Sequence, residues 1–212
     1  MARDEHAHQP LDTGPAPVTT RYVWLVVAIA VVALAFAVAR LAPWRDLDVA
    51  ATNAPDIGGA FELVDHTGRV VTQADFAGDF MLVYFGFTSC PDICPTAMQA
   101  VAEALDDLGD DAARVRPVLI TVDPERDTPA VLADYVAHFH PSLVGLTGTP
   151  EQIAAAARAY KVYYAKVPSE EGDYVMDHSA ILYLMGPDGR YIRHFTHGDG
   201  ADEIAAALRA AL

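Results

Sequence analysis

The two cysteines of the sequence, Cys90 and Cys94, are four residues apart, and this spacing suits metal binding. In a helix, residues i and i+4 have Cβ atoms about 5–6 Å apart. Two sulfurs bound to one tetrahedral metal ion lie about 4 Å apart, so a modest rotamer choice would let both bind the same ion. The spacing also allows a disulfide. The pair could therefore hold a metal when reduced and form a disulfide when oxidised.

A histidine would complete such a metal site. Two thiolates suffice for Cu(I), and a third ligand would tighten the site and admit Cu(II) as well. Of the eight histidines, His178 lies between two predicted strands and follows a polar loop, so it could face the cysteines. An ordinary loop histidine is the alternative interpretation, and the residues alone leave the choice open. Other candidates lie at the ends of predicted elements: His138, His140, His194 and His197.

The elements around the cysteines are predicted from the apolar pattern. Residues 81–87 form an uninterrupted apolar run, typical of a strand buried on both faces. Residues 95–108 have apolar side chains at helical spacing, and Pro95 suits the first helical position. The cysteines would then lie at the carboxyl end of a strand, where α/β proteins place their sites. A helix N-terminus stabilises a thiolate, so we expect a lowered pKa at Cys94.

The rest of the domain alternates strands and helices. The predicted elements are a β-hairpin at 61–64 and 69–72, a strand at 81–87, a helix at 95–108, a strand at 115–122, helices at 129–139 and 151–160, strand pairs at 162–165 with 174–176 and 181–185 with 191–196, and a helix at 202–212. This order predicts an α/β, thioredoxin-like fold over residues 58–212, with an added N-terminal β-hairpin and an inserted hairpin.

The N-terminal part of the chain contains one long apolar segment. Residues 22–39 carry no charge and are nearly all apolar, which is long enough, with the flank at 41–44, to cross a bilayer. We predict a transmembrane anchor at 21–43, a disordered tail at 1–20 and a linker at 44–57. A cleaved signal peptide and a buried core helix are the alternatives. Two Lys/Arg residues flank each side, so the positive-inside rule does not orient the segment.

The charge of the chain is strongly negative, with a formal net charge of −15. Residues 1–45 contain four Lys/Arg and three Asp/Glu, so the remaining residues carry −16. Such a domain is a poor candidate for nucleic-acid binding, because binding to phosphates depends on a positively charged surface. The charge would suit a cationic partner or a metal cation, and solubility alone also explains it.

The sequence resembles the Sco/SenC family of copper proteins in three stretches. They are YFGFTSCPDICP at 84–95, VDPERDTP at 122–129 and DHS at 177–179, and they occur in the family's order. The resemblance spans roughly residues 56–212, together with the single N-terminal anchor. It implies a thioredoxin fold that binds one copper ion, Cu(I) or Cu(II), through Cys90, Cys94 and His178.

The resemblance also implies a function. Members of the family assist assembly of the dinuclear copper centre of cytochrome c oxidase, by delivering copper or by reducing the cysteines of that centre. We therefore expect a copper metallochaperone whose partner is the copper-bearing oxidase subunit, with a second copper chaperone as the candidate donor. The expected location is the inner membrane, single-pass, with the globular domain on the periplasmic side.

Two other functions remain open. A membrane-tethered thiol-disulfide reductase would use Cys90 and Cys94 as its redox pair, although the usual motif of such enzymes has two intervening residues and this one has three. A peroxidase-like thiol enzyme would need positive charge near the thiolate, and no Lys or Arg is close in sequence. For Asp123 and Asp177 we hypothesise a role in orienting the metal ligands. A turn or cap residue is the alternative interpretation of Asp123.

Overall fold

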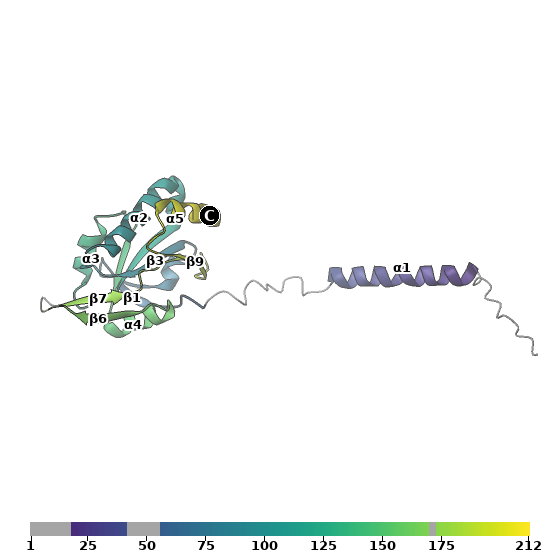
Figure 1. The fold of residues 1–212 in the computed structure, drawn as a ribbon, viewed down its shortest axis with the longest axis horizontal. Coiled ribbons are helices and arrows are strands. Elements are labelled where there is room, and N and C mark those ends of the chain that lie inside the picture. The colour runs from purple at the N-terminus through teal and green to yellow at the C-terminus, as the bar shows by residue number, and fades with distance from the viewer. Residues whose placement is uncertain (1–17, 42–55, 170–172) are drawn as a thin grey trace, which may run out of the picture. The chain divides into compact units, whose positions relative to one another are not determined.

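The computed structural model describes residues 18–41, 56–169 and 173–212 (Figure 1). Contacts divide the chain into two compact units, Met1–Asn53 and Ala54–Leu212. The first unit contains helix α1, Val18–Leu41. Within the described residues, none of the helices combines the length and the hydropathy that a membrane crossing requires. Most of the predicted tail at 1–20 and of the predicted linker at 44–57 lies outside the described residues.

A seven-stranded sheet forms the centre of the second unit, with the strand order β2-β1-β5-β4-β3-β8-β9. Strand β3 is parallel to β4, and β4 is parallel to β5, whereas the other neighbours are antiparallel. All seven residues of β3 are buried, as expected of a strand covered on both faces. The strands are β1 (Glu62–Asp65), β2 (Val70–Thr72), β3 (Phe80–Gly86), β4 (Val115–Thr121), β5 (Val144–Thr147), β8 (Leu182–Met185) and β9 (Tyr191–Phe195).

Helices cover both faces of this sheet. Figure 1 shows α2 and α5 side by side on one face and α4 on the other. Successive residues of a strand point to opposite faces, so Tyr84 of β3 points toward α2 while Phe85 packs on Tyr160 at the end of α4. The helices of this unit are α2 (Ile93–Leu108), α3 (Pro129–Val136), α4 (Pro150–Ala159) and α5 (Ala201–Ala211), with short 3-10 helices η2 (Gln73–Phe76) and η3 (Gly109–Arg114).

Both predicted hairpins are present. Strands β1 and β2 form the N-terminal hairpin. Strands β6 (Tyr164–Pro168) and β7 (Tyr174–His178) form the inserted hairpin, which is a separate two-stranded sheet. His178 is the last residue of β7, so a strand rather than a loop positions it.

The prediction missed one strand and misplaced several boundaries, among them the end of α3 at Val136 and the start of β6 at Tyr164. Strand β5 was not predicted, because four residues that include Gly145 cannot be told from a loop by pattern alone. It completes a second parallel β-α-β unit around α3. Helix α2 begins at Ile93, two residues earlier than predicted, so Pro95 is its third residue. The first N–H groups of a helix have no intrahelical partner, and Pro95 therefore fits there as well.

Candidate metal centre

The two cysteines lie where β3 gives way to α2. Cys90 is half-buried in the connecting loop, and Cys94 is fully buried in the first turn of α2. Both are free thiols. The backbone N–H of Cys94 donates to the Cys90 sulfur at 3.4 Å, which draws that sulfur over the start of the helix.

His178 meets the cysteines from a distant part of the sequence. Its Nε2 atom lies 3.2 Å from the Cys94 sulfur, across a separation of 84 residues. Its ring packs edge-on against Tyr84 and Phe87, with centroid distances of 6.2 and 5.6 Å. Tyr84 is in β3 and Phe87 directly follows it. The strand that leads into the cysteine loop therefore also supports the histidine.

The Cys94 sulfur and the His178 nitrogen are close to the separation that a shared metal ion would require. Metal–sulfur and metal–nitrogen bonds of about 2.3 and 2.1 Å at a tetrahedral angle separate sulfur from nitrogen by about 3.6 Å. The Cys94–His178 distance of 3.2 Å is shorter by about 0.4 Å, as in a thiol–imidazole hydrogen bond. Among the described residues, no group of three or more His, Cys, Asp or Glu is already arranged as a metal site. Two thiols and one imidazole favour copper or zinc over hard cations.

The pKa of Cys94 differs from the expectation. Burial raises the pKa of its thiol to about 12. The expected lowering by the helix N-terminus is therefore wrong for Cys94, because the whole side chain is removed from water and desolvation outweighs the helix dipole. Cys94 is a thiol at neutral pH, and binding a metal must displace its proton.

Gly86, the last residue of β3, makes room for the buried sulfur. A Cβ atom at this position would lie 3.0 Å from the Cys94 sulfur and 2.8 Å from a ring carbon of Tyr84. The Tyr84 hydroxyl donates toward the same sulfur at 4.0 Å. Any residue other than glycine would therefore displace the tyrosine or the cysteine.

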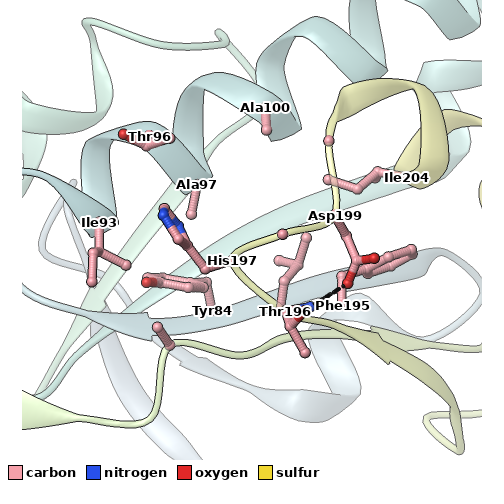
Figure 2. A pocket seen from close by; sticks show the side chains of 14 residues that line it. Tyr84, Ile93, Thr96, Ala97, Ala100, Phe195, Thr196, His197, Asp199 and Ile204 are labelled. Carbon is pink, nitrogen blue, oxygen red and sulfur yellow. Dashed lines mark hydrogen bonds between the residues drawn. The ribbon is translucent and has the colours of Figure 1, made fainter.

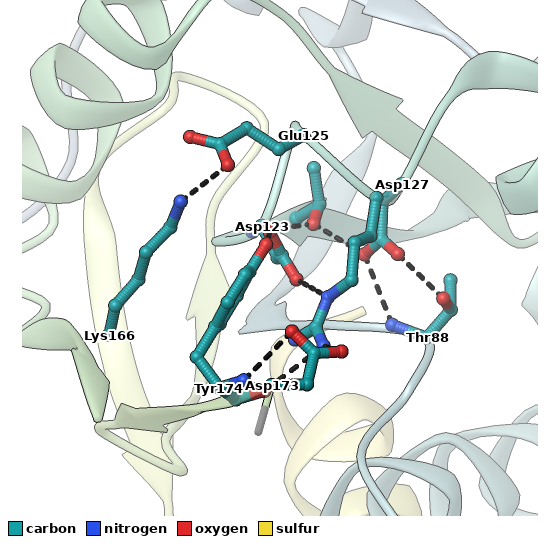
Figure 3. Close-up of polar contacts among 9 residues, drawn as sticks. Thr88, Asp123, Glu125, Asp127, Lys166, Asp173 and Tyr174 are labelled. Atoms are coloured by element: carbon teal, nitrogen blue, oxygen red, sulfur yellow. Dashed lines mark hydrogen bonds and ion pairs between the residues drawn. The ribbon is translucent and has the colours of Figure 1, made fainter. Parts of the chain in front are cut away.

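Asp127 ties together the loops that follow β3 and β4. Its fully buried carboxylate accepts hydrogen bonds from the backbone N–H and hydroxyl of Thr88, at 3.1 and 2.6 Å. It also accepts one from the Thr121 hydroxyl at 2.5 Å. Figure 3 shows Thr88, which opens the cysteine loop, bound to Asp127. Sequence reasoning did not single out Asp127, which is followed by Thr128, the residue that caps α3.

Asp123 and Asp177 are not brought to the cysteines. Asp123 is buried, but its carboxylate accepts hydrogen bonds from Arg126 and from the Tyr174 hydroxyl. Asp177 is exposed and precedes His178 on β7, so the two side chains point to opposite faces of the strand. Arg126 and Tyr174 were not singled out from the sequence, because their partnership joins positions 48 residues apart.

A mainly apolar pocket of about 140 Å³ adjoins the site. Tyr84 and Ile93 line it on the side of the cysteines, and Ala97 and Ala100 of α2 form one wall. Figure 2 shows these side chains together with His197, from the loop that follows β9. Tyr84 is thus shared between the pocket and the packing around Cys94.

The fold and the site together define a class of protein. The protein is a thioredoxin-like α/β domain with a parallel β-α-β core. Its potential metal site combines a cysteine pair at the start of the first crossover helix with a histidine from an inserted hairpin. The SCO1/SenC family model matches residues 49–212, and the chain belongs to this family.

Individual relatives agree with this assignment. The mitochondrial SCO2 homologue of Bos taurus is 47% identical over 154 residues, which cover 71% of this chain and 58% of the relative. The chain thus spans less than two thirds of that relative's length. The structure of Bradyrhizobium japonicum ScoI with copper bound is 46% identical, with a TM-score of 0.69, covering 74% of this chain and 99% of that one. The structure of BsSco is 27% identical, with a TM-score of 0.59, covering 75% of this chain and 95% of that one. BsSco has a disulfide switch and is a member of the Sco family of cytochrome c oxidase assembly proteins.

Proposed function

We propose that this protein is a copper metallochaperone that binds one Cu(I) or Cu(II) ion through Cys90, Cys94 and His178. The observation that carries the proposal is the 3.2 Å distance between the Cys94 sulfur and the His178 Nε2 atom. These residues meet only because the β6–β7 hairpin lies against the end of β3. The structure of the related ScoI with copper bound supports copper as the ion.

The proposed role is to assist assembly of the dinuclear copper centre of cytochrome c oxidase, with the copper-bearing oxidase subunit as acceptor and a second copper chaperone as donor. The description of BsSco supports the link to oxidase assembly. Cys90 is the more exposed thiol of the pair, so exchange with a partner begins there. An incoming ligand of the partner binds copper as Cys90 releases it, and copper keeps its oxidation state.

The proposal includes a location. The uncharged run at 22–39 falls within helix α1, and we assign it as a single-pass anchor in the inner membrane with the globular domain on the periplasmic side. An acidic domain on that side would attract copper ions or a cationic partner surface.

Copper titration of the full-length chain in detergent tests the proposal. Wild type should bind one equivalent of Cu(I) per chain and should form a Cu(II) complex with a thiolate-to-copper absorption band. Cys90→Ser and Cys94→Ser should lose both, and His178→Ala should lose stable Cu(II) binding while its thiols remain reactive. Wild type that binds no copper would contradict the proposal.

A thiol-disulfide reductase is the second candidate, favoured by the free thiols of Cys90 and Cys94 beside one another. In this reaction the Cys90–Cys94 dithiol would reduce a disulfide at the oxidase copper site. Two thiols would form on the acceptor and one disulfide on this chain, so two electrons and two protons are transferred. If oxidase assembly in cells survives His178→Ala, the reductase becomes the better account, because disulfide exchange needs no histidine.

A further inference from the structure

The loop between β4 and α3 contacts both elements that carry the proposed ligands. On one side, Asp127 of this loop holds Thr88 at the start of the cysteine loop. On the other side, Arg126 donates from Nη1 to the backbone carbonyl of Tyr174, the first residue of β7, at 3.0 Å. One short segment therefore lies between Cys90 and Cys94 on one side and the strand of His178 on the other.

The contacts to β7 form a closed cluster of three side chains: Asp123, Arg126 and Tyr174. Arg126 donates from Nε to the Asp123 carboxylate, whose other oxygen accepts a hydrogen bond from the Tyr174 hydroxyl at 2.8 Å. The Arg126 guanidinium also lies over the Tyr174 ring, 4.0 Å from its centroid. Figure 3 shows Asp123 and Tyr174 facing each other at this point. Each member is thus held by the other two.

Burial makes this cluster stronger than an ordinary surface contact. Asp123 is 1% exposed and Arg126 is 27% exposed, so their ion pair is largely removed from water. A second link to the hairpin joins Lys166 to Glu125 at 2.5 Å, but these side chains are 43% and 60% exposed. Exposed pairs contribute little, and the Asp123–Arg126–Tyr174 cluster is therefore the main polar attachment of the hairpin to this loop.

The hairpin needs such an attachment. Strands β6 and β7 pair only with each other, and no ladder joins them to the seven-stranded sheet within the described strands. An isolated two-stranded ribbon is only marginally stable in water. Side-chain contacts must therefore fix where β7 lies, and the position of His178 at its end follows from them.

We infer that Asp123, Arg126 and Tyr174 are positioning residues that hold His178 against Cys94 and thereby set the affinity for Cu(II). This inference rests on the proposed copper site. Two thiolates satisfy Cu(I), whereas Cu(II) needs the imidazole as well. The carboxylate of Asp127 holds the cysteine loop through Thr88 and Thr121 and, among the described residues, forms no hydrogen bond with a side chain of the cluster. Loosening the cluster therefore moves the histidine and leaves the thiols in place. The cluster therefore acts on Cu(II) binding and little on Cu(I) binding.

The test compares Arg126→Gln and Tyr174→Phe with wild type in the full-length chain in detergent. Arg193→Gln is the matched control, because Arg193 forms an exposed ion pair with Glu203 away from the hairpin. Affinities for Cu(I) and Cu(II) are measured by competition with chelators. For Arg126→Gln we expect Cu(II) binding to weaken about 10–100-fold, the range seen when residues that orient ligands are lost. Cu(I) binding should change by less than about threefold, and the control should match wild type.

Tyr174→Phe keeps the Asp123–Arg126 ion pair and so remains informative if Arg126→Gln does not fold. It should weaken Cu(II) binding by a smaller factor and reduce the nitrogen hyperfine structure in the Cu(II) paramagnetic resonance spectrum. Equal loss of Cu(I) and Cu(II) affinity in the variants, or Cu(II) binding and spectra unchanged from wild type, would overturn the inference.

A measurement on the metal-free chain separates this inference from the proposed function. Amide hydrogen exchange at residues 174–178 should be faster in Arg126→Gln and Tyr174→Phe than in wild type or Arg193→Gln. Unchanged exchange in both variants would refute the positioning role even if copper binds. Faster exchange in a protein that binds no copper would support the attachment of the hairpin and refute the copper site.

Discussion

Replacing Gly86 by alanine tests how tightly the cysteine site is packed. The added Cβ would lie 3.0 Å from the Cys94 sulfur and 2.8 Å from the Tyr84 ring. Both neighbours are almost completely buried, and the β3 backbone is held in register with β4, where Gly86 pairs with Thr121. Neither the strand nor its neighbours can give way easily. Overpacking of this kind costs about 1–3 kcal/mol.

That cost gives a measurable shift. For a domain of 150–250 residues, 1 kcal/mol corresponds to about 2–4 °C in melting temperature, so we expect Gly86→Ala to melt roughly 2–12 °C lower. Copper affinity should also fall, because Cys94 is displaced from its position beside His178. Urea unfolding followed by circular dichroism gives the free energy, and competition titration gives the affinity.

Gly198→Ala is the matched control for this experiment. A Cβ at Gly198 meets no atom within 4 Å, so its stability and copper affinity should equal those of wild type. The packing argument would be refuted if the unfolding free energy of Gly86→Ala were within about 0.5 kcal/mol of wild type and its copper affinity were unchanged. Substitutions at ordinary surface positions have effects of that size.

Two further predictions concern buried carboxylates. Asp127→Asn should destabilise the domain by about 1–3 kcal/mol and weaken copper binding, because the amide cannot accept all the hydrogen bonds from Thr88 and Thr121. An unfolding free energy in urea and a copper affinity equal to those of wild type would contradict this prediction. Asp65 is largely buried, which alone would raise its pKa, but hydrogen bonds from Thr67 and Arg69 lower the pKa from 3.8 to about 2. The ionised Asp65 carboxylate therefore contributes about 1–2 kcal/mol to the free energy of unfolding above pH 4, and this contribution is lost as the pH falls through 2. The unfolding free energy of Asp65→Asn should show a correspondingly smaller decrease between pH 4 and 2, and a decrease equal to that of wild type would refute the assignment.

The sequence predicted the elements around the site because local patterns specify them. The buried strand β3 is a continuous apolar run, and the helix after it has apolar residues at regular spacing. A local pattern also starts α4, because the Thr149 side chain accepts a hydrogen bond from the Gln152 N–H and so caps the helix. Strand β5 escaped prediction because four residues with a glycine carry too weak a pattern, and only pairing with β4 and β1 makes them a strand.

The site itself was only partly accessible from the sequence. The spacing of Cys90 and Cys94 indicated a metal or redox pair, but the residues alone could not select His178 among eight histidines; the family resemblance did so. The raised pKa of Cys94 follows from burial by other parts of the fold, which local sequence does not encode. Arg126 and Tyr174 were missed for the same reason, since their contact depends on how the inserted hairpin packs.

X-ray absorption at the copper edge tests the three-ligand site most directly. The full-length chain is loaded with one equivalent of Cu(I), and the ligands are identified from the extended fine structure, with His178→Ala measured alongside. The account predicts two sulfur neighbours and one imidazole nitrogen in wild type, and loss of the imidazole signal alone in the variant. A wild-type spectrum with only sulfur neighbours, or an imidazole signal that persists in His178→Ala, would contradict it.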